Sequence, residues 1–288
     1  MIEYVVGNYL VSIGRMTEEQ FVQMFDRQDK IHVKLGMIAV SEGYMTKAEA
    51  DGINNSQMSV DEKFGDIAVK KGLLTDLQLS SLLRLQGNSY HAFIQTLTDM
   101  GIIGIEEADD IVRKAKNRLG LSAEDVEAIK NNDVDRILPI FMPDASSEMK
   151  EIVGVLLRTI IRCADRHVFL EAPVFSDSVA VTDGALQSVD GEYSYTSAIE
   201  EDNGGLIKIA CAYAKENFTE VDDDVLDAAG EFLNCVNGIF ASRMSMKNIP
   251  LEIKPQTYAK NTEKLFGKQV LSLPVYIRGK KLKFIILV

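Results

Sequence analysis

This sequence of 288 residues has no tryptophan and only three cysteines and three histidines. No two cysteines form a C-x-x-C pair and the histidines are scattered; the six residues are His32, His91, Cys163, His167, Cys211 and Cys235. A zinc site needs grouped Cys and His ligands, and a serine or cysteine triad needs a histidine as its base. We therefore expect no metal site and no triad, and we expect buried, reduced cysteines in a cytosolic protein.

Positive charge is also scarce, because 31 Lys and Arg residues stand against 43 Asp and Glu residues and give a formal net charge of -12. Nucleic acids and anionic membranes are bound mainly through Lys and Arg, so neither is expected as a partner. The sequence contains no apolar run long enough for a membrane span, and its start lacks the basic residues of a signal peptide. The composition predicts a cytoplasmic protein without membrane insertion, and the length suggests about two domains.

A repeat fills the first 115 residues. The segment KLGMIAVSEGYMTKAEADGINNSQ, residues 34–57, aligns without a gap with KFGDIAVKKGLLTDLQLSSLLRLQ, residues 63–86, at a period of 29 residues. The pattern recurs upstream in residues 5–28 and, more weakly, downstream. In each main copy a glycine, Gly43 or Gly72, stands where a short helix should end, and a threonine three residues later starts a capping box. Each unit is predicted to be a helix pair, and stacked pairs make an all-α domain.

This tandem motif, with its glycines, aliphatic run and final glutamine, resembles the N-terminal domain of type II secretion and type IV pilus assembly ATPases, called MshEN. Some members of that family bind cyclic di-GMP, so the resemblance implies Lys34, Gln57, Lys63 and Gln86 as contacts of such a ligand. Ligand-binding members begin each copy with arginine, whereas this chain has lysine. A guanidinium can stack on guanine and donate a fork of hydrogen bonds, but an ammonium offers only a point charge. A helical module that contacts only proteins is the alternative.

The helical pattern is interrupted at Pro139 and Pro143, and we place a domain boundary near residue 137. A helical repeat domain is expected at 1–136 and a second domain at 137–288. The second domain starts with an amphipathic helix from Glu148. The expected strands are residues 167–171, 178–182, 192–200, 206–212, 251–259, 269–277 and 281–288. They are grouped around two substantial helices rather than alternating with them, so this half is predicted to be α+β.

The second of these helices contains LDAAGEFLNCVNG, residues 226–238, in which apolar side chains cover most of the circumference. At about 100° per residue, one narrow side collects the polar and smallest residues: Asp227, Gly230, Glu231, Asn234 and Gly238. Burying an unpaired carboxylate and amide would be costly, so this stripe must face water or a partner. It is either an ordinary solvated face or a docking face, on which the glycines let a partner come close.

The stretch DVLDAAGEFLNCVNG, with Pro255 some twenty residues later, resembles the signature helix of the CheX/CheC family of chemotaxis phosphatases. The order of elements from residue 145 onward is similar as well. The resemblance implies that Glu231 pairs with a conserved lysine of a phosphorylated response-regulator receiver, and that Asn234 orients the water that attacks phosphorus. Asp227 matches the acidic or serine position that often begins the motif. CheC-type proteins carry two such helices and only one is found here, so the copy is CheX-like.

Two functions remain open. The first is a phosphatase that hydrolyses the aspartyl phosphate of a CheY-like receiver, a reaction that mainly needs a water held in line with the leaving oxygen. The receiver would supply Mg²⁺, so no cofactor of this chain is expected. The second is a non-catalytic interaction protein of a motility, pilus or secretion pathway, with cyclic di-GMP as its ligand in one version. A homodimer is also expected, because the final strand would be a sheet edge that a second copy could cover.

Overall fold

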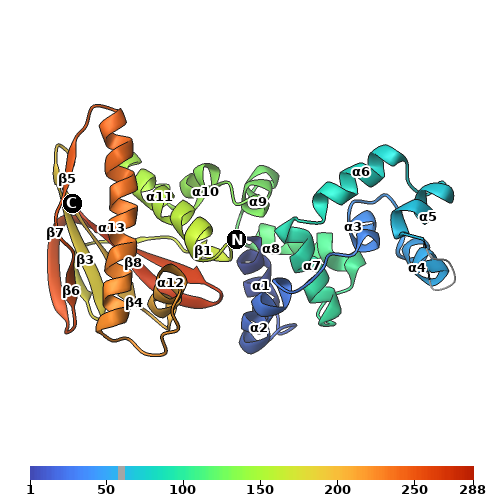
Figure 1. The fold of residues 1–288 in the computed structure, drawn as a ribbon, viewed down its shortest axis with the longest axis horizontal. Helices are drawn as coiled ribbons and strands as arrows, with labels where there is room; N and C mark the ends of the chain where they lie inside the picture. The colour runs from blue at the N-terminus through green and yellow to red at the C-terminus, as the bar shows by residue number, and fades with distance from the viewer. Residues whose placement is uncertain (58–61) are drawn as a thin grey trace. The chain divides into compact units, whose positions relative to one another are not determined.

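The computed structural model describes residues 1–57 and 62–288 and divides into two compact units. The helical unit comprises residues 2–130, and the sheet unit comprises residues 131–288 together with Met1 (Figure 1). The boundary expected near residue 137 lies inside helix α10, Val134–Phe141, and a domain border there stays a prediction.

The helical unit consists of short helices joined by tight turns. Its elements are α1 Ile2–Ser12, α2 Glu18–Gln28, α3 Leu35–Ser41, α4 Lys47–Gln57, α5 Phe64–Lys70, α6 Asp76–Leu85, α7 Ser89–Asp99, the 3₁₀ turn η1 Ile105–Glu107, α8 Ala108–Arg118 and α9 Ala123–Lys130. Complete capping boxes begin α2 at Thr17 and α6 at Thr75. Four glycines that follow helices have φ between +69° and +71°, a conformation that a side chain would strain: Gly14, Gly43, Gly72 and Gly101. The capping residues therefore lie where the sequence predicts them.

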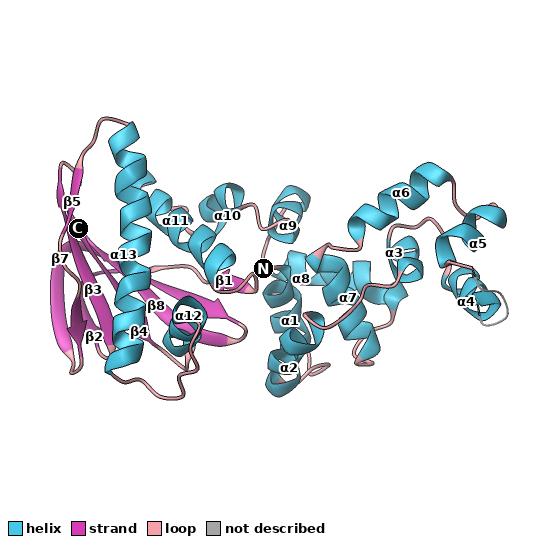
Figure 2. Ribbon diagram, in the orientation of Figure 1, coloured by secondary structure: helices cyan, strands magenta, loops and turns pink. Residues whose placement is uncertain are grey.

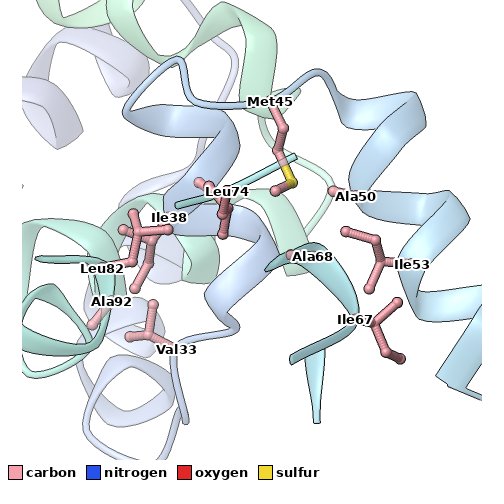
Figure 3. Packing of buried hydrophobic residues seen from close by; sticks show 11 residues of the cluster. Val33, Ile38, Met45, Ala50, Ile53, Ile67, Ala68, Leu74, Leu82 and Ala92 are labelled. Carbon is pink, nitrogen blue, oxygen red and sulfur yellow. The ribbon is translucent and has the colours of Figure 1, made fainter. Parts of the chain in front are cut away.

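One apolar cluster joins α3, α4, α5 and α6 (Figure 3). Its buried members are Val33, Ile38, Ala39, Met45, Ala50, Ile53, Ile67, Ala68, Leu74, Leu82 and Ala92. Close approach between the helices depends on two glycines, because a Cβ on Gly36 would lie 2.9 Å from the ring of Phe64, and one on Gly65 would lie 2.5 Å from Leu79. The first glycine of each 24-residue segment is therefore a packing requirement.

The sheet unit combines helices with a curled antiparallel sheet (Figure 2). Its elements are α10 Val134–Phe141, α11 Ser147–Cys163, β1 Val168–Leu170, β2 Val174–Val181, β3 Gly184–Gly191, β4 Tyr195–Glu201, α12 Gly205–Ala214, α13 Asp223–Met246, β5 Leu251–Ile253, β6 Thr257–Ala259, β7 Glu263–Ile277 and β8 Lys280–Leu287. The expectation of a strand at residues 206–212 is wrong. This segment forms α12, which packs against α13 and β8. Strand β3 has no counterpart among the expected strands.

The strand order of the sheet is β1-β7-β8-β4-β3-β5, with β2 also paired to β7 and β6 also paired to β3. Strand β8 therefore lies inside the sheet, hydrogen-bonded to β7 on one side and to β4 on the other. The expectation that the last strand is an exposed edge is wrong, since both of its edges are already paired. A homodimer stays a prediction that no longer has this strand as its reason.

Side chains of β3 and β4 alternate between two apolar layers. Leu186 and Ala198 are paired across the strands and contribute to a cluster on the face away from α13. The next pair, Gln187 and Ser197, points to the opposite face, where both hydrogen-bond to α13. Alternation along a strand thus brings two polar residues of neighbouring strands to the same side of the sheet, beneath the helix.

Helix α13 has 24 residues and starts at a strong cap, since Asp222 Oδ1 accepts a hydrogen bond of 2.9 Å from the backbone N–H of Val225.

The cysteines are free, but the expectation that all are buried is wrong. Cys163 is exposed as the last residue of α11, whereas Cys211 and Cys235 are half-buried. Cys235 follows Asn234 directly and therefore lies at the border between the buried and polar sides of α13.

Candidate functional site

The polar stripe of α13 lies at the accessible side of this helix. Asp227 and Glu231 are exposed and Asn234 is half-buried, whereas the apolar residues around them are packed against the rest of the unit. Glu231 and Asn234 are separated by one helical turn, so their side chains are neighbours on the helix surface. The structure thus brings the two predicted catalytic residues together on one face.

The carboxylates of the stripe are held by the segment that contains β6. Gln256 Nε2 donates a hydrogen bond of 2.7 Å to Glu231 Oε1, and Tyr258 OH donates one of 2.8 Å to Asp227 Oδ1. Burial raises the pKa of Tyr258, and the hydrogen bond to Asp227 adds to this, so the phenol stays a donor at neutral pH. Both carboxylates are therefore ordered while one oxygen of Glu231 remains available to a cation.

The two glycines of the stripe differ in their surroundings. A Cβ on Gly230 would lie 2.9 Å from Tyr258 Cε1 and 3.1 Å from Gln256 Cγ, so the space beside this glycine is taken by the chain itself. The expectation that Gly230 makes room for a partner is wrong for that reason. Gly238 has no heavy atom within 4 Å of such a Cβ, so its surface is open.

The side chain of Asn234 is hydrogen-bonded to strand β3 beneath the helix. Gln187 Nε2, from β3, donates a hydrogen bond of 2.9 Å to Asn234 Oδ1 and another of 2.9 Å to the backbone carbonyl of Lys254. Gln187 is 2% exposed, so the partner of Asn234 is a core residue. The amide of Asn234 is thereby fixed from its buried side.

A second layer of buried polar groups supports Gln187. Asn237 Nδ2 donates to Gln187 Oε1 at 2.7 Å and to Ser197 Oγ at 2.9 Å. Tyr195 OH donates to Asn237 Oδ1 at 3.0 Å, and burial raises the pKa of this phenol, which keeps its proton. We call Gln187, Ser197, Tyr195 and Asn237 the amide network. Each of its members is buried and hydrogen-bonded, as buried polar groups require.

The stripe can hold a positive group and a water side by side, because a carboxylate attracts cations and an amide both donates and accepts. No group of three or more potential metal ligands occurs in residues 1–57 and 62–288.

The residues expected to contact a nucleotide lie together in the helical unit. Lys34, Gln57, Lys63 and Gln86 all line one cavity of about 630 Å³. Both glutamines use their amide nitrogen within the chain, since Gln57 Nε2 donates to the Glu62 carbonyl at 3.0 Å and Gln86 Nε2 donates to the Val33 carbonyl at 2.9 Å. The two lysines are exposed residues of the cavity lining, and Lys34 Nζ lies 4.0 Å from Asp99 Oδ1.

Four residues of the α13 site were not expected from the sequence: Gln187, Asn237, Gln256 and Tyr258. A signal existed for Asn237, because a second amide three residues after Asn234 in an apolar helix needs a buried partner. For Gln187 the sequence offers no signal, since its contact with Asn234 spans 47 positions. Gln256 and Tyr258 follow Pro255, in a region whose hydrogen-bond partners only the fold defines.

No protein-family model matches this sequence, and no curated protein matches it. Over the C-terminal half, similar solved structures are chemotaxis proteins of the CheX and CheC type at low identity. A chemotaxis protein CheX from Desulfovibrio desulfuricans is 13% identical, with 49% of this chain and 98% of that chain covered and a TM-score of 0.42. A CheC-like superfamily protein from Shewanella sp. PV-4 is 16% identical, with 50% and 98% covered and a TM-score of 0.43.

A further similar structure is a complex of CheX with CheY, BeF₃ and Mg²⁺ from Borrelia burgdorferi. It is 14% identical, with 49% of this chain and 97% of that chain covered and a TM-score of 0.40.

Among the helices that the structure describes, none combines the length and the apolar character that crossing a membrane requires.

Proposed function

We propose that this chain hydrolyses the aspartyl phosphate of a response-regulator receiver, with Glu231 and Asn234 as its catalytic residues. The observation that carries the proposal is the contrast between these neighbours. Glu231 is exposed and held at its surface position by Gln256, while Asn234 is half-buried on the same face and held from below by Gln187. The resemblance of residues 224–238 to the CheX/CheC signature helix supports the same assignment.

The two residues have separate tasks in this proposal. Glu231 binds a lysine of the receiver through the carboxylate oxygen that Gln256 does not occupy, and so positions the two proteins. Asn234 holds a water in line with the bond between phosphorus and the aspartyl oxygen, which is the main requirement of phosphoryl transfer to water. Water then adds its oxygen to phosphorus, the bond between phosphorus and the aspartyl oxygen breaks, and the aspartate leaves as a carboxylate. Both protons of the water remain with the phosphate, which is released as H₂PO₄⁻. Mg²⁺ held by the receiver would supply charge stabilisation at the phosphoryl group.

The test follows the decay of a phosphorylated receiver with the full chain and its variants. We expect acceleration by the wild type and at least a tenfold loss in Asn234→Ala and in Glu231→Ala, because positioning a water typically contributes that much or more. The matched control is Asp177→Ala, which removes an exposed carboxylate from β2, and its rate should equal that of the wild type. Equal decay with wild type and Asn234→Ala would contradict the proposal and favour a non-catalytic interaction protein.

A second candidate function concerns the helical unit, and we infer that its cavity binds cyclic di-GMP. The observation in favour is that Lys34, Gln57, Lys63 and Gln86 line one cavity although they are spread over 53 positions of the sequence. Two ammonium groups at one cavity suit a ligand with two phosphates, and its partly apolar walls suit purine rings. The MshEN-like motif supports the same ligand.

Binding is tested by calorimetry and by thermal stabilisation of the full chain with cyclic di-GMP, since a ligand of the native state raises its stability. The double variant Lys34→Ala/Lys63→Ala should lose the heat and the stabilisation. Lys116→Ala, which removes a lysine from α8 outside the cavity, should keep both. Absence of heat and of stabilisation in the wild type at high micromolar ligand would leave the cavity as a feature of helix packing.

A further inference from the structure

We propose that Gln187 is the positioning residue of Asn234, and that it determines which end of the Asn234 amide faces the reacting water. This inference rests on the proposed phosphatase function. Gln187 does not reach the surface itself, because it is 2% exposed and lies on β3 beneath α13. It would act only through its hydrogen bond to Asn234.

The orientation of Gln187 follows from the groups around it. The backbone carbonyl of Lys254 can only accept, so the Gln187 atom 2.9 Å from it must be the nitrogen Nε2. The opposite atom, Oε1, then faces Asn237 Nδ2 at 2.7 Å. The choice between oxygen and nitrogen, which an isolated amide leaves open, is thus decided by a main-chain group.

The orientation of Asn234 follows in turn. Gln187 Nε2 has a second N–H, and it points at Asn234, so the Asn234 atom facing it must be the acceptor Oδ1. Turning the Asn234 amide by 180° would place two N–H donors against each other with no acceptor between them. Asn234 Nδ2 makes no hydrogen bond within the described part of the chain. Its two N–H groups therefore remain for the partner side, together with the second lone pair of Oδ1.

This orientation matters for the reaction because a water needs its donors and acceptors in defined places. A fixed Asn234 offers one N–H that donates to a lone pair of the water or to a phosphoryl oxygen, and one carbonyl lone pair that can accept a proton of the water. Reversal of the amide would exchange these two groups and turn the attacking lone pair away from phosphorus. The amide network therefore prepares the productive orientation before a receiver binds.

Placement in the fold gives the network a role beyond packing. The neighbouring positions of β3 that face the same side, Ala185 and Val189, are apolar and fully buried. A further apolar pair would have served the core equally well without the need to satisfy every polar atom. The network is linked to the surface through Asn234, the residue that the proposed reaction uses.

The test compares Gln187→Met, which keeps the size and removes the donor, with Gln187→Glu, which keeps the shape and offers an acceptor where the donor was. Both should lower kcat for receiver dephosphorylation at least about tenfold, while KM for the phosphorylated receiver stays within about twofold, because the docking surface is unchanged. The matched control is Ser188→Ala, which removes a hydrogen bond to Thr196 of 2.9 Å on the opposite face of the same strands. The unfolding temperature of Ser188→Ala should fall less than that of the Gln187 variants, because only one half-buried hydrogen bond is lost, and its kcat should stay unchanged.

Nuclear magnetic resonance of the wild-type full chain gives a second readout that needs no variant. The side-chain amide protons of Gln187 should exchange slowly with solvent, and those of Asn234 should exchange fast. Protected Asn234 protons close to the Gln187 amide would overturn the orientation. A wild type that is active alongside fully active Gln187 variants would overturn this inference alone, whereas an inactive wild type would overturn the proposed phosphatase function and this inference with it.

Discussion

Two glycines of α13 that look equivalent in the sequence have opposite requirements for space. Gly230 is overlaid by Tyr258 and Gln256, whereas nothing lies within 4 Å of a Cβ on Gly238. Gly230→Ala should therefore displace the Tyr258 ring from Asp227 and destabilise the sheet unit by about 1–2 kcal/mol. Gly238→Ala should stabilise it by about 0.5–1 kcal/mol, because alanine favours a helix interior. Thermal unfolding of the two variants measures this difference.

The informative result is whether Gly230→Ala lowers the unfolding temperature while Gly238→Ala raises it. Equal unfolding temperatures would mean that the β6 segment does not rest on Gly230. The double variant Gly230→Ala/Tyr258→Ala serves as a control, since without the ring only Gln256 Cγ, 3.1 Å from the added Cβ, has to shift and the methyl group should cost less.

His91 provides a prediction about pH. Its side chain is buried in α7, its Nε2 lies 3.1 Å from Glu42 Oε1 and its Nδ1 has no hydrogen-bond partner in the described residues. Burial lowers the pKa of His91, and the hydrogen bond and charge of Glu42 only partly oppose this. The unfolded chain therefore takes up a proton as the pH falls below about 6.5, while the folded chain does not, and stability decreases.

An NMR titration should place the midpoint of His91 below 6.5. Between pH 7.5 and 5.5 the wild type should lose more stability than His91→Gln, which keeps a donor for Glu42 and does not titrate. A midpoint at or above 6.5 would mean that Glu42 dominates over burial.

At the scale of single residues, the sequence predicts the exposed residues of the α13 site and misses the buried ones. Glu231 and Asn234 are found because the period of one helix places them together, and helical periodicity is local information. Gln187 and Tyr258 are missed because each meets α13 through a contact that only the folded sheet creates. The role of Gly230 is misassigned for the same reason, since its neighbours lie 26 and 28 positions further along the chain.

At the scale of elements, the errors fall on segments whose local preference is weak. Residues 206–212 are a short apolar run, which periodicity alone does not distinguish from a strand. The segment becomes α12 because Glu201 accepts hydrogen bonds from the backbone N–H groups of Gly204 and Leu206 at its start. Strand β3 contains Gly, Ala, Gln, Ser and Asp, which favour strands poorly, and forms because β4, β5 and β6 pair with it.

The start of α12 offers a prediction. A Cβ on Gly205 would lie 2.4 Å from the backbone carbonyl group of Lys281 in β8, and a backbone atom cannot turn aside as a side chain can. Gly205→Ala should therefore destabilise the sheet unit by about 2–3 kcal/mol or more. Thermal unfolding measures the loss, with Gly238→Ala as the helix-interior control. An unchanged unfolding temperature would contradict the close contact between α12 and β8.

At the scale of the whole molecule, we expect the sheet unit to fold without the helical unit. Every strand pairing and the amide network lie within residues 131–288. A fragment of these residues should show one cooperative transition in calorimetry and a dispersed NMR spectrum. A fragment that binds hydrophobic dyes and lacks a cooperative transition would show that the helical unit is needed for the fold.

The inner position of β8 has a consequence for synthesis on the ribosome. Glu201 at the end of β4 pairs with Leu282 of β8, so 81 residues must be added before the two strands can begin to pair. At typical elongation rates this takes about 4–16 s. During that interval an open strand edge with apolar residues such as Ile199 is available to other nascent chains. The time needed to translate the segment between these two strands therefore sets how long this edge of β4 stays unpaired.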